Sequence, residues 1–123
     1  DHDRAKFEAK KQLMQQIVDF LNIKYNNRLT CEIKDQYYNM REMVEPVFYV
    51  VERAMKAMEE AGITPKVQPI RGGTDGANLS FRNLPCPNIF AGGHNFHGKY
   101  EYVPLESMVK ATEVVINIAK ITK

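Results

Sequence analysis

The stretch of sequence that decides the expected fold is Asn88-Ile89-Phe90-Ala91, a short apolar run that ends at Gly92-Gly93. An apolar run of this length, bounded by turn-forming residues, is typical of a buried strand in a parallel sheet. A second short extended stretch, residues 66–70, also runs into glycines. Helical patterns lie before, between and after these stretches, so residues 46–121 are predicted to form helix, strand, helix, strand and helix. The expected fold class is therefore α/β, with parallel strands flanked by helices.

The helical segments are recognised by apolar side chains that recur every three or four residues and by the residues at their ends. The first helix after residue 40 begins at Pro46, because proline is tolerated at the first position of a helix. It ends at Gly62, which readily takes the left-handed conformation of a helix end. A short helix is predicted over residues 77–81, with Thr74 and Asp75 before it as candidate caps. The last helix occupies the C-terminal end, again after a proline.

The N-terminal part of the chain has a different pattern. Residues 3–21 are predicted to form an amphipathic helix with one buried side. A polar turn follows, and residues 29–34 then alternate between apolar and polar side chains, as in a half-buried antiparallel strand. One helix and one strand cannot close a core alone. Because the pattern changes near residue 40, we expect two parts, residues 1–42 and residues 43–123.

Charge and hydropathy exclude several classes of function. The chain has 123 residues, with 17 Lys and Arg against 15 Asp and Glu, which gives a net charge of +2. This balance provides no electrostatic reason to expect nucleic acid or an anionic membrane surface as a partner. No apolar run approaches the roughly 18 residues that a membrane span needs, and the first residues show no signal-peptide pattern. Because the chain does not begin with Met, we expect a fragment or a processed product.

The two cysteines, Cys31 and Cys86, are too far apart in the sequence for a zinc-binding pair of the C-x-x-C type. The favoured interpretation is two reduced, mostly buried thiols in a cytoplasmic protein, with a disulfide as the alternative.

Two glycine-rich loops are the candidates for function, because open α/β sheets bind ligands at the carboxyl ends of their strands. Two parallel strands would bring both loops to one edge of the sheet. The first loop, residues 71–76, contains Arg71 but matches neither a P-loop nor a dinucleotide-binding motif. Two roles are therefore open for Arg71: binding an anionic ligand, or pairing with a surface carboxylate in a tight turn.

The second loop, residues 92–99, contains His94 and His97. A neutral imidazole is a common zinc ligand, and neighbouring glycines let the backbone approach a buried metal. The alternative is a hydrogen-bonded structural histidine. A zinc site needs three or four protein ligands, and the sequence offers no matching cluster of His or Cys. Any metal at this loop must be completed by residues outside these 123.

Several motifs together resemble the aminoacylase-like two-zinc peptidases, and within them the bacterial tripeptide aminopeptidases. The similarity runs through essentially the whole chain, and the stretches that carry it are Tyr37–Glu42, Ile70–Ala77, Leu79-Ser80-Phe81, Leu84–Asn88, and Gly92-Gly93 through His97-Gly98-Lys99.

This resemblance implies the C-terminal portion of a cytoplasmic zinc aminopeptidase that releases the N-terminal residue from tripeptides. Such enzymes have a two-zinc catalytic α/β domain that is interrupted by a smaller lid domain. Residues 1–42 would be the last helix and strand of the lid, through which two copies of the complete enzyme form a homodimer. Residues 43–123 would be the C-terminal part of the catalytic domain.

The resemblance also implies roles for two residues. His97, directly before Gly98, matches a ligand of one zinc ion, whereas His94 falls where relatives can carry a non-ligand residue. Arg71 matches a position associated with holding the substrate carboxylate. The other zinc ligands and the catalytic carboxylates belong to the N-terminal half of such enzymes, so this chain holds no catalytic residue and is expected to be inactive alone. From the residues alone, a small non-catalytic binding module that uses both loops for an anionic ligand stays open as the alternative.

Overall fold

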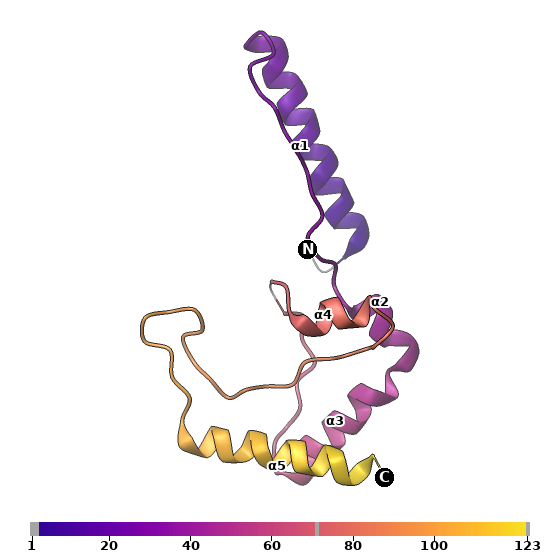
Figure 1. Ribbon diagram of the computed structural model, residues 1–123, viewed down its shortest axis with the longest axis vertical. Coiled ribbons are helices and arrows are strands. Elements are labelled where there is room, and N and C mark those ends of the chain that lie inside the picture. The colour runs from indigo at the N-terminus through magenta and orange to yellow at the C-terminus, as the bar shows by residue number, and fades with distance from the viewer. Residues whose placement is uncertain (1–2, 71, 123) are drawn as a thin grey trace.

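The computed structural model describes residues 3–70 and 72–122 of the chain. In chain order it contains α1 (Arg4–Lys24), α2 (Arg41–Val44), the short 3-10 helix η1 (Glu45–Val47), α3 (Tyr49–Glu60), α4 (Asp75–Ser80) and α5 (Leu105–Ile121). Figure 1 shows an elongated arrangement in which α1 projects from the rest of the molecule. The helices α3 and α5 lie at the opposite end, and α2 and α4 lie between the two ends.

No sheet forms among the described residues, so the prediction of an α/β fold with parallel strands is wrong for this chain. Residues 63–70 and 84–93, which contain the two predicted parallel strands, run through the molecule without strand pairing. The antiparallel strand predicted at residues 29–34 is also wrong, because residues 28–39 are extended without a strand partner. Within the described ranges, the one β-type pairing is an isolated antiparallel bridge between His94 and Tyr102. An extended segment becomes a strand only when a neighbour completes its ladder, and two short strands alone form at best a marginal sheet.

The helix predictions are confirmed, with small changes in their bounds. Pro46 lies in η1, and α3 begins shortly after it. The end of α3 is built around Gly62, whose φ of 73° is left-handed. The Gly62 amide donates to the carbonyl of Glu59 (2.9 Å), and the Ile63 amide donates to the carbonyl of Met58 (2.9 Å). These two bonds satisfy carbonyls that the helix end would otherwise leave unpaired, as in a Schellman motif.

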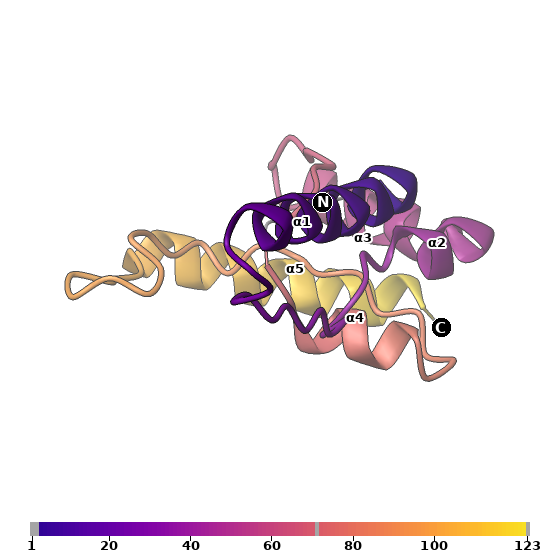
Figure 2. The ribbon, with the colours of Figure 1, turned by 90° about the horizontal axis from the view of Figure 1, so that it is seen from above.

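The core of the molecule lies where α3 packs against α5. Val114 of α5 is fully buried, and it lies in one apolar cluster with Ala57 of α3 and with Ala61, which directly follows α3. The small alanine side chains let the two helices approach closely, and Phe90 packs against the same cluster from the connecting segment. The ammonium group of Lys110 donates to the carbonyl of Ala61 (2.7 Å), which ties the end of α3 to α5. Figure 2 shows α5 lying beneath the other helices, with the preceding loop extended away from them.

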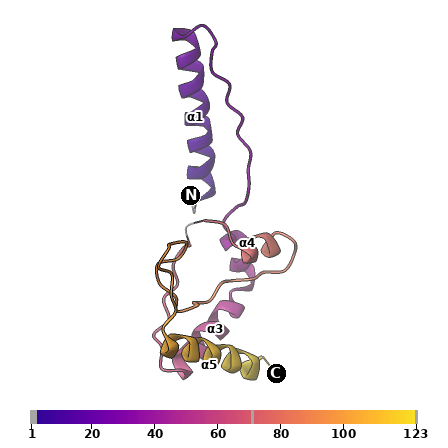
Figure 3. The same cartoon turned by 60° about the vertical axis from the view of Figure 1, so that its left-hand side comes forward.

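The helix α1 and the segment that returns along it form an arm, defined here as residues 3–39. Figure 3 shows this segment running back beside α1 toward α2. The turn at the tip contains Asn26 and Asn27, both with a left-handed φ of 54°. The side chain of Asn22 then brackets Leu29, donating to its carbonyl (3.0 Å) and accepting from its amide (2.9 Å).

The prediction that one side of α1 is buried is wrong, because no described residue of α1 is buried. Met14 and Ile17 keep about half of their surface exposed, at 51% and 45%, and Phe20 keeps 66%. A single returning segment is too narrow to cover an apolar face that spreads around the helix. The arm therefore presents a broad apolar surface to its surroundings.

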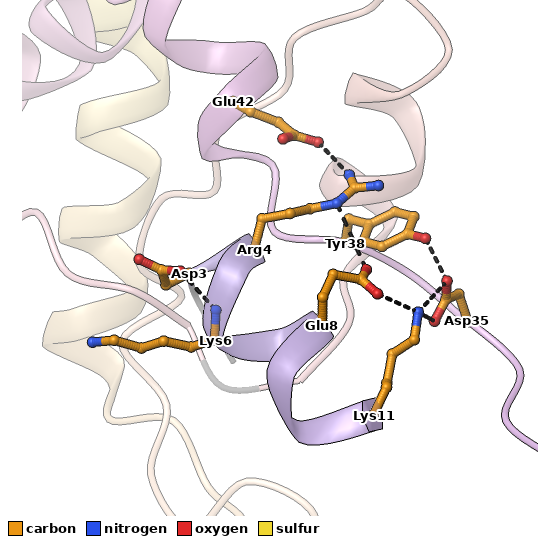
Figure 4. Close-up of polar contacts among 8 residues, drawn as sticks. All are labelled: Asp3, Arg4, Lys6, Glu8, Lys11, Asp35, Tyr38 and Glu42. Atoms are coloured by element: carbon orange, nitrogen blue, oxygen red, sulfur yellow. Dashed lines mark hydrogen bonds and ion pairs between the residues drawn. The ribbon is translucent and has the colours of Figure 1, made fainter. Parts of the chain in front are cut away.

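A network of charged and aromatic side chains fixes the base of the arm (Figure 4). The Lys11 ammonium lies 2.9 Å from both carboxylate oxygens of Asp35, and the Tyr38 hydroxyl donates to the same carboxylate (2.5 Å). The Arg4 guanidinium lies 3.8 Å from the centre of the Tyr38 ring and donates to Glu42 (3.0 Å). The pKa of Asp35 is lowered, first by the hydrogen bond from Lys11 and then by that from Tyr38. Its carboxylate in turn raises the pKa of Tyr38.

Tyr38 also joins the arm to the middle of the molecule. Its ring packs edge-on against Phe7 of α1, with ring centres 6.1 Å apart, and at a tilt against Phe81 after α4, at 5.9 Å.

The described helices include none with the length and apolar character that crossing a membrane requires.

The buried position of Val114 gives a direct test of the helix packing. We expect Val114→Ala to lower the free energy of unfolding by about 2 kcal/mol, because it removes two buried methyl groups and leaves a cavity. The neighbouring Val115 is 54% exposed, so Val115→Ala is the matched control and should change stability by about 0.5 kcal/mol or less. Urea unfolding measures both, and equal losses would contradict the assigned packing.

The Asp35 network predicts a loss of stability in acid. A carboxylate with a lowered pKa stabilises the fold above its ordinary pKa of 3.8, and this contribution disappears as the pH falls through the lowered value. The stability difference between the wild type and Asp35→Asn should therefore be full at about pH 6 and vanish in strong acid. Thermal unfolding across this range measures it, with Asp19→Asn as the control on the same arm. A difference that stays constant with pH would contradict the network.

Candidate functional site

The first glycine-rich loop leads into α4, and its far end is held by buried polar contacts. The hydroxyl of Thr74 accepts a hydrogen bond from the amide of Ala77 (3.2 Å), so the predicted cap at Thr74 is confirmed. Ser80 is fully buried; its hydroxyl donates to the carbonyl of Gly76 (2.7 Å) and accepts from the amide of Cys86 (2.9 Å). These bonds fold the segment after α4 back onto the helix.

Gly76 is needed for this arrangement because the chain passes very close to it. A Cβ atom at Gly76 would lie 2.5 Å from the carbonyl oxygen of Cys86 and 2.6 Å from the side-chain oxygen of Asn88. Real Cβ atoms do not approach a backbone oxygen so closely, so any larger residue would push α4 away from the following segment. The glycine in this motif therefore serves close packing of backbone.

An open pocket of about 440 Å³ lies between α4 and the end of the arm. Its walls are mostly polar, and the lining residues are Gln36, Tyr37, Gly73, Thr74, Asp75 and Asn78. The ring of Tyr37 lies 2.7 Å from the position of a Cβ atom at Gly73, so only glycine lets the arm approach the loop this closely. The pocket was not predicted, because Gln36 and Tyr37 are far from the loop in sequence. Arg71, the predicted anion-binding residue of this loop, lies outside the described residues.

The second glycine-rich loop forms a small hairpin before α5. His94 and Tyr102 exchange backbone hydrogen bonds (2.8 and 3.2 Å), and their rings stack with centres 5.1 Å apart. Between them, the amide of Gly98 donates to the carbonyl of Asn95 (2.9 Å), and the amide of Glu101 donates to the carbonyl of Gly98 (3.2 Å). The hairpin is thus closed at its base and turned at its tip by backbone bonds.

The two histidines of this loop have different surroundings. His94 belongs to the base of the hairpin, and its ring is stacked on Tyr102. His97 lies at the exposed tip with a left-handed φ of 63°, and its amide donates to the carboxylate of Glu101 (2.9 Å). Among the described residues, neither ring nitrogen of His97 has a hydrogen-bond partner. His94 is also exposed, and its ring nitrogens likewise have no hydrogen-bond partner among the described residues, so the two imidazoles differ in that the ring of His94 stacks on Tyr102.

Direct polar contacts between the two loops are absent from the described part of the chain. Among the described residues, no hydrogen bond or ion pair joins residues 72–76 to residues 92–99. The prediction that both loops open on one edge of a sheet fails for the same reason as the sheet itself. Each loop therefore has to be considered as a separate site.

A metal centre needs more than this part of the chain provides. Within residues 3–70 and 72–122, no group of three or more His, Cys, Asp or Glu side chains is close enough to hold a metal ion. An exposed imidazole with both ring nitrogens available is, by its donor chemistry, suited to serve as one metal ligand. The described residues thus fit a metal at one coordination position, through His97, and do not form a complete site.

The two cysteines are free thiols, as predicted. Both Cys31 and Cys86 are partly exposed, so the expectation that they are mostly buried is too strong. The amide of Cys86 supports the Ser80 contact described above, which makes the backbone at this position part of the α4 unit.

Comparison with known proteins defines the class to which the chain belongs. Residues 9–121 match the model of peptidase family M20/M25/M40. The chain therefore belongs to this peptidase family, and the resemblance recognised in its motifs is confirmed.

Its curated relatives carry the name Peptidase T. The chain is 59% identical to Peptidase T of Alkaliphilus oremlandii, 57% to that of Geobacillus thermodenitrificans and 56% to that of Clostridium novyi. Each comparison extends over 122 residues and covers 98% of this chain and 30% of the relative. The chain thus spans about 30% of the length of the curated relatives that it matches.

Proposed function

We propose that this chain is the C-terminal part of a cytoplasmic, zinc-dependent aminopeptidase that releases the N-terminal residue from tripeptides. The observation that carries the proposal is identity of 53–59% to relatives named Peptidase T across 98% of the chain. The compared 122 residues include the loops as well as the helices. Membership in the peptidase family favours this function over a non-catalytic binding module.

The proposal gives His97 the role of one zinc ligand. The family motif directly before Gly98 is what favours His97 over His94, and the exposed, unpartnered imidazole of His97 is compatible with this role. The stacking of the His94 ring on Tyr102 supports a structural role for that residue. Metal ions bound in such a site polarise the scissile carbonyl and lower the pKa of a bound water. The described residues of this chain supply at most part of the ligand set, so we propose that the chain alone is inactive.

Arg71 is proposed to hold the C-terminal carboxylate of the tripeptide. A guanidinium group donates two parallel hydrogen bonds to a carboxylate, which fixes both the position and the orientation of the substrate. The polar pocket is lined in part by Gly73 and Thr74, which follow Arg71 by two and three positions in the sequence. It gives a peptide substrate polar surroundings at the same loop.

The division of the parent protein into domains is also a proposal. Residues 1–42 are assigned to the lid domain, and residues 43–123 to the catalytic domain. We propose that two copies of the complete enzyme form a dimer through the lid. The exposed apolar side chains of α1, including Leu13 and Phe20, support a role of the arm in such contacts.

The role of His97 is tested in the complete peptidase that carries this chain. Removing a residue that only supports a metal ligand costs about 10- to 100-fold in metal affinity. We expect His97→Ala, which removes the ligand itself, to reduce zinc affinity by at least this factor and to reduce the turnover of tripeptides as well. His94→Ala should have a much smaller effect on both. Zinc content after dialysis and tripeptide hydrolysis measure the two losses. Equal losses from the two variants would overturn the assignment.

The role of Arg71 is tested with two substrates. Arg71→Lys keeps the charge but loses the planar fork, so it should raise the Michaelis constant for free-acid tripeptides by about tenfold or more. Tripeptides with an amidated C-terminus never make this contact, and the substitution should hardly affect them. If the substitution impairs both substrates equally, Arg71 supports the turn and does not bind the carboxylate.

A further inference from the structure

The tip of the hairpin at residues 94–102 has an uncommon backbone conformation at His97, the proposed zinc ligand. His97 has a φ of 63°, in the left-handed region that non-glycine residues adopt uncommonly, Asn, Asp and His more often than the others. This conformation decides the direction in which the imidazole leaves the loop. A residue held in a sparsely populated conformation persists only when its surroundings impose it.

The backbone bonds of the hairpin do not involve His97 itself. They close the base between His94 and Tyr102 and the turn between Asn95, Gly98 and Glu101. The side chain of Asn95 adds a bond to the carbonyl of Tyr100 (3.2 Å). All of these contacts fix the loop on either side of His97.

Glu101 makes the contact that acts on His97 directly. Its carboxylate oxygen Oε2 accepts the hydrogen bond of the His97 amide at 2.9 Å. A bond from a backbone amide to an ionised carboxylate is stronger than one between neutral groups. The bond ties the amide of His97 to a residue four positions further along the chain, on the returning side of the hairpin.

We propose that Glu101 is a positioning residue, whose carboxylate fixes the left-handed backbone of His97 and thereby aims the imidazole at the metal. The inference rests on the proposed function, in which His97 is a zinc ligand. Glu101 acts in it only through the backbone of His97 and does not contact the metal or the substrate.

The test compares Glu101→Ala and Glu101→Gln in the complete peptidase. Gln keeps an oxygen that can accept the amide bond, whereas Ala removes the acceptor. The matched control is Glu106→Ala, which removes an exposed carboxylate in the first turn of α5 that has no side-chain hydrogen bond among the described residues. Three quantities are measured: zinc affinity by competition with a chelator, amide hydrogen exchange of the peptide that contains His97, and the thermal midpoint of the metal-free protein.

We expect Glu101→Ala to weaken zinc binding by about 10- to 100-fold and to accelerate amide exchange at the tip of the hairpin. Glu101→Gln should stay much closer to the wild type in both measurements, because the acceptor is kept. The thermal midpoint of the metal-free protein should change no more than in the Glu106→Ala control. A merely structural role of Glu101 would instead lower this midpoint in step with the zinc affinity, and would overturn the proposal.

Three further outcomes test this inference, and the last two separate it from the proposed function. If Glu101→Gln loses as much zinc affinity as Glu101→Ala while amide exchange at the tip of the hairpin stays as slow as in the wild type, the charge does not act through the amide, and the positioning role is wrong. If His97→Ala loses zinc while Glu101→Ala binds it like the wild type, only the role of Glu101 fails. If His97→Ala retains zinc, the ligand assignment fails, and the role of Glu101 fails with it.

Discussion

The contact on which the rest of the structure depends is the close packing of α3 against α5 around Val114. Ala57 and Ala61 present little more than backbone at this crossing, so the two helices approach until Val114 is fully buried. Lys110 and Asn117 of α5 then donate hydrogen bonds to carbonyls near the end of α3. Because α5 starts directly after the hairpin that carries His97, this packing also anchors one end of that hairpin.

A second fixed point lies at Tyr38, where three parts of the chain meet. Its hydroxyl bonds to Asp35, its ring receives the Arg4 guanidinium, and Phe7 and Phe81 pack against it. The polar pocket lies beside this junction, with one wall from the arm and the other from α4. A change in the angle of the arm would therefore change the pocket, since Tyr37 already touches the backbone at Gly73.

The candidate site was partly accessible from the sequence. Glycines beside His97 and before α4 marked the two loops correctly, and Thr74 caps α4 as its residue type predicts. The roles of Gln36, Tyr37 and Glu101 were missed. Tyr37 and Gly73 are neighbours only after folding, and the His97 amide meets the Glu101 carboxylate only once the turn between them has formed.

The sequence by itself determined the helices and the family. Helices depend on hydrogen bonds and side-chain spacing within one segment, so the periodicity, Pro46 and Gly62 located them correctly. The family was carried by the identity of short motifs, and the match over residues 9–121 confirms it. Only the tertiary structure decided whether the predicted strands form, because a strand exists only when another segment completes its hydrogen-bond ladder. The apolar run at residues 88–91 has the composition of a strand, but within the described residues its Phe90 packs against helices and no neighbouring strand pairs with it.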